Sequence, residues 1–129
     1  MTRPTTPFAV LLTAASLLLG TLVWASDVQL EGDPERAQPV YAKYCVTCHG
    51  EAGKGDGVMA KFLDTPPKDF TNVEYMETRT DQQLYEAIAE GGAAVGLSDK
   101  MAPWKHVLSE QEMKDLTLYV RKLQRAGGE

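Results

Sequence analysis

Cysteine and histidine are scarce in this sequence of 129 residues, which contains only two of each. The cysteines are Cys45 and Cys48, one histidine is the adjacent His49, and the other is His106. A structural zinc site takes four ligands, usually cysteine or histidine. Because no third cysteine is present, the composition argues against a zinc site.

An excess of positive charge is also missing. The sequence has 13 lysine and arginine residues against 18 aspartate and glutamate residues, which gives a formal net charge of −5. Nucleic acids and anionic membrane surfaces attract basic proteins, so this acidity argues against both as partners. The sequence contains no internal repeat and no low-complexity tract, and its length predicts one small domain.

The first 25 residues have the features of a secretory signal peptide. Arg3 precedes an uncharged run over residues 8–25, and this run ends in Val23-Trp24-Ala25. The run is about 18 residues long, at the lower limit for spanning a bilayer, so an uncleaved membrane anchor is the alternative. No twin arginine is present, and no cysteine ends the run, which argues against a lipoprotein anchor.

We therefore expect cleavage after residue 25 and export to the periplasm by the general secretory route. The remaining single domain, residues 26–129, carries 12 basic and 18 acidic residues, a net charge of −6. With the signal peptide removed, no membrane insertion is expected.

Residues 45–49, Cys-Val-Thr-Cys-His, form the pattern that attaches haem covalently. Thiols three residues apart on a helical turn can reach the two vinyl groups along one edge of the porphyrin, and the following imidazole can bind the iron. A disulfide, a zinc half-site and a thioredoxin-like redox pair are the alternatives. The redox pair requires a βαβ setting, but a glycine-rich stretch follows His49. We expect one haem c, attached at Cys45 and Cys48, with His49 as an iron ligand.

The rest of the sequence favours helices and contains no convincing strand. Asp33 and Pro34 are suited to begin a first helix that runs into the cysteines. Pro39 would either kink this helix or move its start to near Gln38.

Two later segments have the form of capping boxes, at Thr80–Gln83 and Ser109–Glu112. They predict a short helix that ends at Gly91 and a last helix with an apolar face. Residues 50–79 lie between the attachment motif and the first capping box. Their composition predicts a loop with one helical turn around residues 58–63.

The second axial ligand of the iron decides between ligand-binding chemistry and electron transfer. Met101 lies in an irregular segment and is followed by Ala102-Pro103-Trp104, which suits it to present a thioether. Met76 and His106 remain as alternatives. Met59 is too close to His49 in sequence, and Met113 belongs to the apolar face of the last helix.

Together these residues resemble the small soluble class I cytochromes c over residues 37–123. The matching segments are the attachment motif at 45–50, the glycine-rich turn at 53–57, the middle helix at 80–91 and the segment from Met101 into the last helix. The resemblance implies an all-α class I cytochrome c fold, with three to five helices wrapped around one covalently attached haem and the N- and C-terminal helices crossing. It also implies Met101 as the second axial ligand. Ala37 and Pro39 depart from the family pattern where the helices cross, and Ala102 separates Met101 from Pro103.

The resemblance further implies a monohaem one-electron carrier that is not an enzyme and that meets donor and acceptor redox proteins at an exposed haem edge. A tightly bound electron-transfer subunit of a periplasmic dehydrogenase or oxidase complex is the main alternative, and an open-site haem sensor or enzyme is a weaker one. The haem pocket is expected to be lined by Phe62, Phe70, Leu84, Ile88, Trp104 and Leu116.

Overall fold

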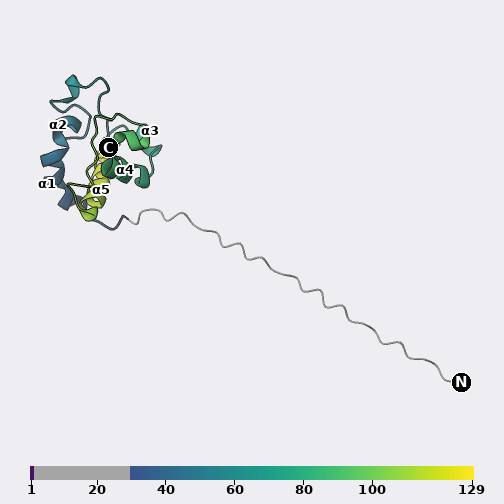
Figure 1. The fold of residues 1–129 in the computed structure, drawn as a ribbon. Coiled ribbons are helices and arrows are strands. Elements are labelled where there is room, and N and C mark those ends of the chain that lie inside the picture. Colours follow the sequence, from purple (N-terminus) through teal and green to yellow (C-terminus); the bar gives the residue numbers. More distant parts are fainter. Residues whose placement is uncertain (2–29) are drawn as a thin grey trace.

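The computed structural model describes residue 1 and residues 30–129 (Figure 1). The signal peptide predicted for residues 1–25 therefore lies almost entirely outside the described residues. Within the described part, no helix combines the length and the apolar character needed to cross a membrane.

Regular structure in residues 30–129 is exclusively helical, with no strand. The α-helices are α1 (Pro34–Tyr44), α2 (Val46–His49), α3 (Val73–Glu77), α4 (Asp81–Glu90) and α5 (Glu110–Gly127). Two short 3-10 turns are η1 (Ala60–Phe62) and η2 (Gly92–Val95). This architecture confirms the expected all-helical class.

Helix α1 begins at Pro34, and the start near Gln38 considered from the sequence is wrong. The carboxylate of Asp33 accepts a hydrogen bond from the backbone N–H of Glu35 at 2.9 Å and so caps the helix. Pro39 lies inside the helix and has no N–H to donate to the preceding turn. The N-cap and Pro34 at the first position together favour the earlier start.

Helices α1 and α5 pack against each other, as Figure 1 shows in the lower part of the domain, with α1 at the left and α5 beside it, and this confirms the expected crossing. Ala37 has no exposed surface and Tyr41 is 2% exposed, so the α1 face towards α5 is fully buried. The ring of Tyr41 packs on the ring of Tyr119, with centroids 5.0 Å apart. The small side chain of Ala37 permits the close approach that the family pattern achieves with glycine.

Both predicted capping boxes are present. At the start of α4, the Thr80 hydroxyl accepts from the backbone N–H of Gln83 at 3.1 Å, and the Gln83 amide oxygen accepts from the N–H of Thr80 at 3.0 Å. Ser109 and Glu112 make the same reciprocal pair at the start of α5.

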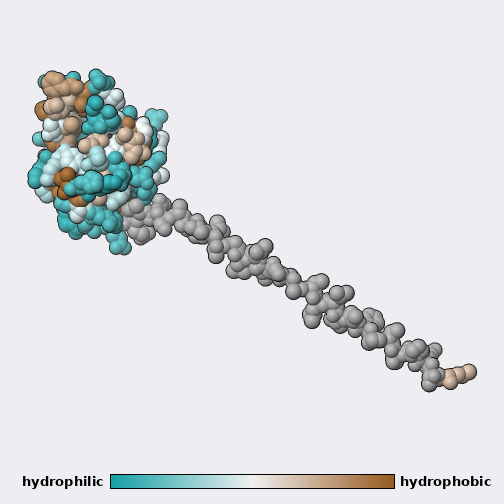
Figure 2. Space-filling model, in the orientation of Figure 1, coloured by the Kyte–Doolittle hydropathy of each residue, from teal (hydrophilic) through white to brown (hydrophobic). Residues whose placement is uncertain are grey.

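The segment from residue 50 to residue 79 is more ordered than a loop. It contains η1, close to the predicted turn, and α3, which the sequence pattern did not reveal. Asn72 caps α3 by accepting from the N–H of Tyr75 at 3.0 Å. Apolar atoms lie at the surface where η1 projects, as Figure 2 shows at the top of the domain, and they include the exposed side chains of Val58, Met59 and Phe62.

Candidate functional site

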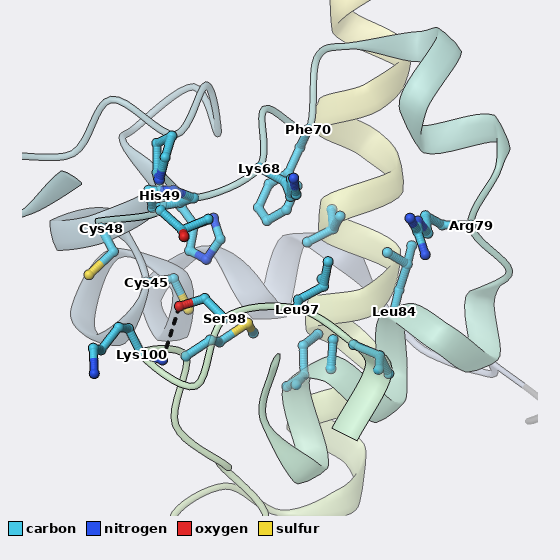
Figure 3. Close-up of a pocket in the computed structure, with 18 of the residues that line it drawn as sticks. Cys45, Cys48, His49, Lys68, Phe70, Arg79, Leu84, Leu97, Ser98 and Lys100 are labelled. Carbon is cyan, nitrogen blue, oxygen red and sulfur yellow. Dashed lines mark hydrogen bonds between the residues drawn. The ribbon is translucent and has the colours of Figure 1, made fainter. Parts of the chain in front are cut away.

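A large cavity opens at the surface between α2, α4 and the loops that follow them. Its volume is about 1260 Å³ when the space at its mouth is included, and its lining is mainly apolar. Figure 3 shows the side chains that project towards it. Cavities that hold small organic ligands or cofactors are usually apolar with a few convergent polar groups, and this one follows that pattern.

Helix α2 and its N-cap residue, Cys45, bring the three residues of the attachment motif to this cavity. The backbone N–H groups of Cys48 and His49 both donate to the carbonyl of Cys45, at 3.1 and 2.9 Å, which closes a single helical turn. Residues three and four apart share one face of such a turn, so Cys45, Cys48 and His49 all line the cavity. Both cysteines are free thiols, and burial is the main cause that raises the pKa of Cys45 to about 11.

The imidazole of His49 is neutral over the physiological pH range. Burial lowers its pKa to about 4. The nearby backbone of Lys68 favours the protonated ring and raises the pKa, but its effect is smaller than that of burial. The ring stacks on Phe70 with centroids 4.7 Å apart. Its Nδ1 atom is buried and makes no hydrogen bond of normal geometry with any described residue. The neutral imidazole is the form of histidine that binds a metal ion.

Two contacts outside the motif hold α2 in place. The hydroxyl of Tyr41 donates to the carbonyl of Gly50 at 2.8 Å, and this bond is buried. The backbone N–H of Gly57 donates to the carbonyl of Cys48 at 3.1 Å. A Cβ atom at Gly57 would lie only 2.4 Å from the carbonyl oxygen of Thr47, so the loop can rest on α2 only with glycine there. No pattern in the sequence pointed to this hydrogen bond of Tyr41, because it joins a helix residue to a loop carbonyl.

The segment that carries Met101 is fastened to the end of α4. The carbonyl of Met101 accepts from the N–H of Gly92 at 3.0 Å, and the N–H of Trp104 donates to the carbonyl of Ile88 at 3.0 Å. Gly91 has φ +86°, and a Cβ there would lie 2.8 Å from the Met101 carbonyl oxygen. The half-buried side chain of Met101 lines the cavity together with His49.

The other candidate ligands fall into two groups. Met76 is fully buried and lines the same cavity as Met101. His106 and Met59 are exposed and do not line it, and Met113 is 5% exposed within the core, as expected. Two methionines are therefore available to an iron bound between them and His49, and the choice of Met101 stays a prediction.

The predicted pocket residues are mostly at the cavity. Phe70, Leu84, Ile88 and Trp104 line it, and Leu116 lines a smaller cavity that adjoins it. The prediction for Phe62 is wrong, because its side chain is 67% exposed and lies outside the lining. Among the described helices η1 contacts only α2, so its outer face stays in solvent.

The donor set fits a covalently bound iron porphyrin. An apolar cavity contains two free thiols on one turn, a neutral imidazole beside them and at least one thioether. Thiols can form thioether bonds to the vinyl groups, and imidazole with thioether is an established axial pair for haem iron.

Comparison with known proteins agrees with this fit. The family model described as cytochrome c oxidase, cbb3-type, subunit III matches residues 32–120. The chain belongs to this family. It is also similar to the cbb3-type cytochrome c oxidase subunit FixP of Bradyrhizobium diazoefficiens, with 26% identity over 91 residues. The match covers 70% of this chain and 28% of FixP, so the chain spans little more than a quarter of that relative's length.

Two solved structures share the fold. The KustC0563 c-type cytochrome has a TM-score of 0.57 and 27% sequence identity, over 68% of this chain and 96% of that one. A chain of the Kuenenia stuttgartiensis reducing HAO-like protein complex Kustc0457/Kustc0458 has a TM-score of 0.59 and 25% identity, over 76% of this chain and 45% of that one. The protein is thus a small class I c-type cytochrome, and a domain of this size carries one covalently bound haem c.

Proposed function

We propose that this cytochrome carries single electrons between redox proteins in the periplasm. One observation supports this most directly: His49 and Met101 line the same apolar cavity as Cys45 and Cys48. An iron with two strong protein ligands has no free position for a substrate, which suits electron transfer rather than catalysis.

In this proposal each residue has a defined task. Cys45 and Cys48 hold the haem through thioether bonds, while His49 and Met101 bind its iron. The haem supplies reversible one-electron chemistry. The chain's own contribution is to exclude water and to surround the iron with apolar side chains, which disfavours the more highly charged ferric state.

The attachment is tested by optical spectroscopy of the protein exported from a host that matures c-type cytochromes. We expect a pyridine haemochrome spectrum of haem c and a sulfur-to-iron charge-transfer band in the oxidised protein. The double variant Cys45→Ser/Cys48→Ser should lose covalent haem. Colourless wild-type protein would contradict the proposal, and rapid binding of carbon monoxide to the reduced protein would indicate an open iron site instead.

The export proposal concerns residues 1–25, which we infer to be a signal peptide removed before residue 26. Mass spectrometry of the exported protein should show a chain that begins at Ser26, with haem added. A mass that includes residues 1–25 would instead indicate a retained membrane anchor.

The partners are proposed to be redox proteins that meet an exposed haem edge in a short-lived complex. Because the domain is acidic, we expect it to attract basic partners. Salt screens this attraction, so added salt should slow reduction of the cytochrome by a basic partner. A rate that does not change with ionic strength would argue against electrostatic docking. Purification in a stable complex would instead favour a bound electron-transfer subunit.

A further inference from the structure

Arg79 places a buried, unsatisfied donor at the haem cavity. Its side chain lines the cavity, and its Nε atom is buried with no hydrogen-bond acceptor in the described part of the protein. The guanidinium carbon lies 4.9 Å from the ring centroid of Tyr75, which holds the group at the cavity wall. A buried guanidinium N–H without an acceptor costs free energy. A group bound in the cavity could remove this cost by supplying a hydrogen-bond acceptor to Nε.

The backbone at Arg79 is hydrogen-bonded to a side chain of α5. The guanidinium of Arg121 donates to the backbone carbonyl of Arg79 and, at 3.0 Å, to that of Met76. It also donates to the carboxylate of Asp81 at 2.6 Å. These bonds tie the turn between α3 and α4 to the last helix, so the backbone that carries Arg79 is rigidly placed.

The charged side chains that line the cavity are all of one sign. Its lining includes three cations, Lys68, Arg79 and Lys100, and no aspartate or glutamate among the described residues. The sequence as a whole has more acidic than basic residues, so this local excess of cations does not follow from composition. A cavity of this kind is complementary to an anionic group.

The proposed attachment fixes which part of the haem reaches Arg79. The two vinyl groups lie along one edge of the porphyrin, and the two propionates extend from the opposite edge. Figure 3 shows Cys45 and Cys48 on one side of the cavity and Arg79 on the other. A haem tied at the cysteines therefore directs its carboxylates away from them and towards the side where Arg79 lies.

We propose that Arg79 binds a haem propionate, with its Nε–H and a terminal N–H donating to the carboxylate. Such paired donation is the arrangement in which arginine binds carboxylates most strongly. The inference rests on the attachment through Cys45 and Cys48 stated under Proposed function. Arg79 would then be a positioning residue: it would hold the far edge of the macrocycle and compensate the negative charge of the propionate within the apolar cavity.

The test compares Arg79→Gln with Arg125→Gln, which removes the same charge from an exposed position in the last turn of α5. Infrared difference spectra between the oxidised and reduced holoproteins, with haem labelled by ¹³C in its carboxyl groups, report the propionates directly. We expect Arg79→Gln to shift the carboxylate band, and Arg125→Gln to leave it as in the wild type.

The second readout is the pH profile of the midpoint potential. A propionate that loses its cation is protonated more easily, so the pH range over which the potential changes should move up by about one unit or more in Arg79→Gln. Lys68 and Lys100, the other cations of the lining, are unchanged and keep the remaining field constant. Arg79→Lys keeps the charge, so its pH profile should stay near that of the wild type, while the loss of paired donation still shifts the band.

A covalently loaded Arg79→Gln protein with the wild-type band and pH profile would overturn this inference alone. If Arg79→Gln yields no holoprotein, Arg79→Lys decides, and an unshifted band in that variant overturns the inference. Haem that acidified acetone extracts from the wild type would instead overturn the attachment at Cys45 and Cys48, and this inference with it.

Discussion

Arg36 and Asp115 join the first and last helices of the fold. The Nε and Nη2 atoms of Arg36 donate to the two carboxylate oxygens of Asp115, at 2.9 and 3.0 Å. The side chain of Asp115 is buried and also accepts from the backbone N–H of Asp33 at 2.7 Å and from Gln111 at 3.0 Å. Burial by itself would raise the pKa of this carboxyl group, but the donors outweigh it and hold the pKa below 3.8.

Replacing Asp115 by Asn should lower the free energy of unfolding of the holoprotein by about 1 to 3 kcal/mol at pH 7. Because the folded-state pKa lies below the unfolded one, the contribution of the carboxylate is complete above pH about 3.8 and is lost as the pH falls through the folded-state pKa. Urea unfolding should therefore show a difference between wild type and variant that narrows below pH 3.8.

A matched control is Asp99→Asn, which removes the same charge from a side chain that is 75% exposed. It should change the free energy of unfolding by less than about 0.5 kcal/mol. A deficit in Asp115→Asn that stays constant down to the most acidic pH would show that the ionised carboxylate is not its cause.

Removing the hydroxyl of Tyr41 should leave the buried carbonyl of Gly50 without its donor. Tyr41→Phe is expected to lose about 1 to 3 kcal/mol of unfolding free energy in urea, with covalent haem retained. Tyr119→Phe removes a hydroxyl from the neighbouring ring, where the described residues show no hydrogen bond to it, and should cost less. Equal losses in the two variants would argue against a role for the Tyr41 bond.

Single substitutions can distinguish which of the two methionines at the cavity, Met76 or Met101, binds the iron. If Met101 is the second axial ligand, as proposed, Met101→Ala should abolish the sulfur-to-iron charge-transfer band and allow carbon monoxide to bind quickly. Met76→Ala removes a fully buried side chain, so it should cost about 2 to 5 kcal/mol of stability while the band persists. If the band disappears in Met76→Ala or His106→Ala and survives in Met101→Ala, the axial assignment is wrong.

Gly91 and Gly96 allow the placement of Met101 to be tested without touching the methionine. Both have positive φ, +86° and +73°, so alanine strains the backbone at either position. Only at Gly91 would the new Cβ press on the Met101 carbonyl oxygen, whereas at Gly96 it meets nothing within 4 Å. We expect Gly91→Ala to weaken the charge-transfer band more than Gly96→Ala, as followed by absorbance of the oxidised proteins. Equal bands would show that this segment adjusts freely.

The helices were predictable where the sequence carries local signals. The capping boxes at Thr80 and Ser109 and the cap at Asp33 are read from residues a few positions apart, and all three begin helices in the structure. Helix α3 was missed because a helix of five residues is too short to show a periodic pattern. Pro39 made the start of α1 ambiguous, and the cap at Asp33 decided it.

The exposure of side chains was harder to predict. Phe62 was expected at the haem pocket, yet its side chain lies in solvent on η1. Arg79 gave no signal in the sequence, and its importance depends on a buried Nε atom that lacks an acceptor. Both features are set by packing between segments distant in sequence, which no local pattern records.

The sequence by itself determined the class of chemistry. Two thiols and an imidazole within five residues predict covalent haem, and the family comparison bears this class out. Only the tertiary structure decided which distant side chains share a cavity with that motif. Met76 and Met101 both line the cavity, whereas His106 does not. Arg79 also lines it, on the side away from the cysteines. The reason is physical: a single helical turn fixes the positions of its own residues, whereas the opposite wall is built from segments brought together by the packing of α4 and α5.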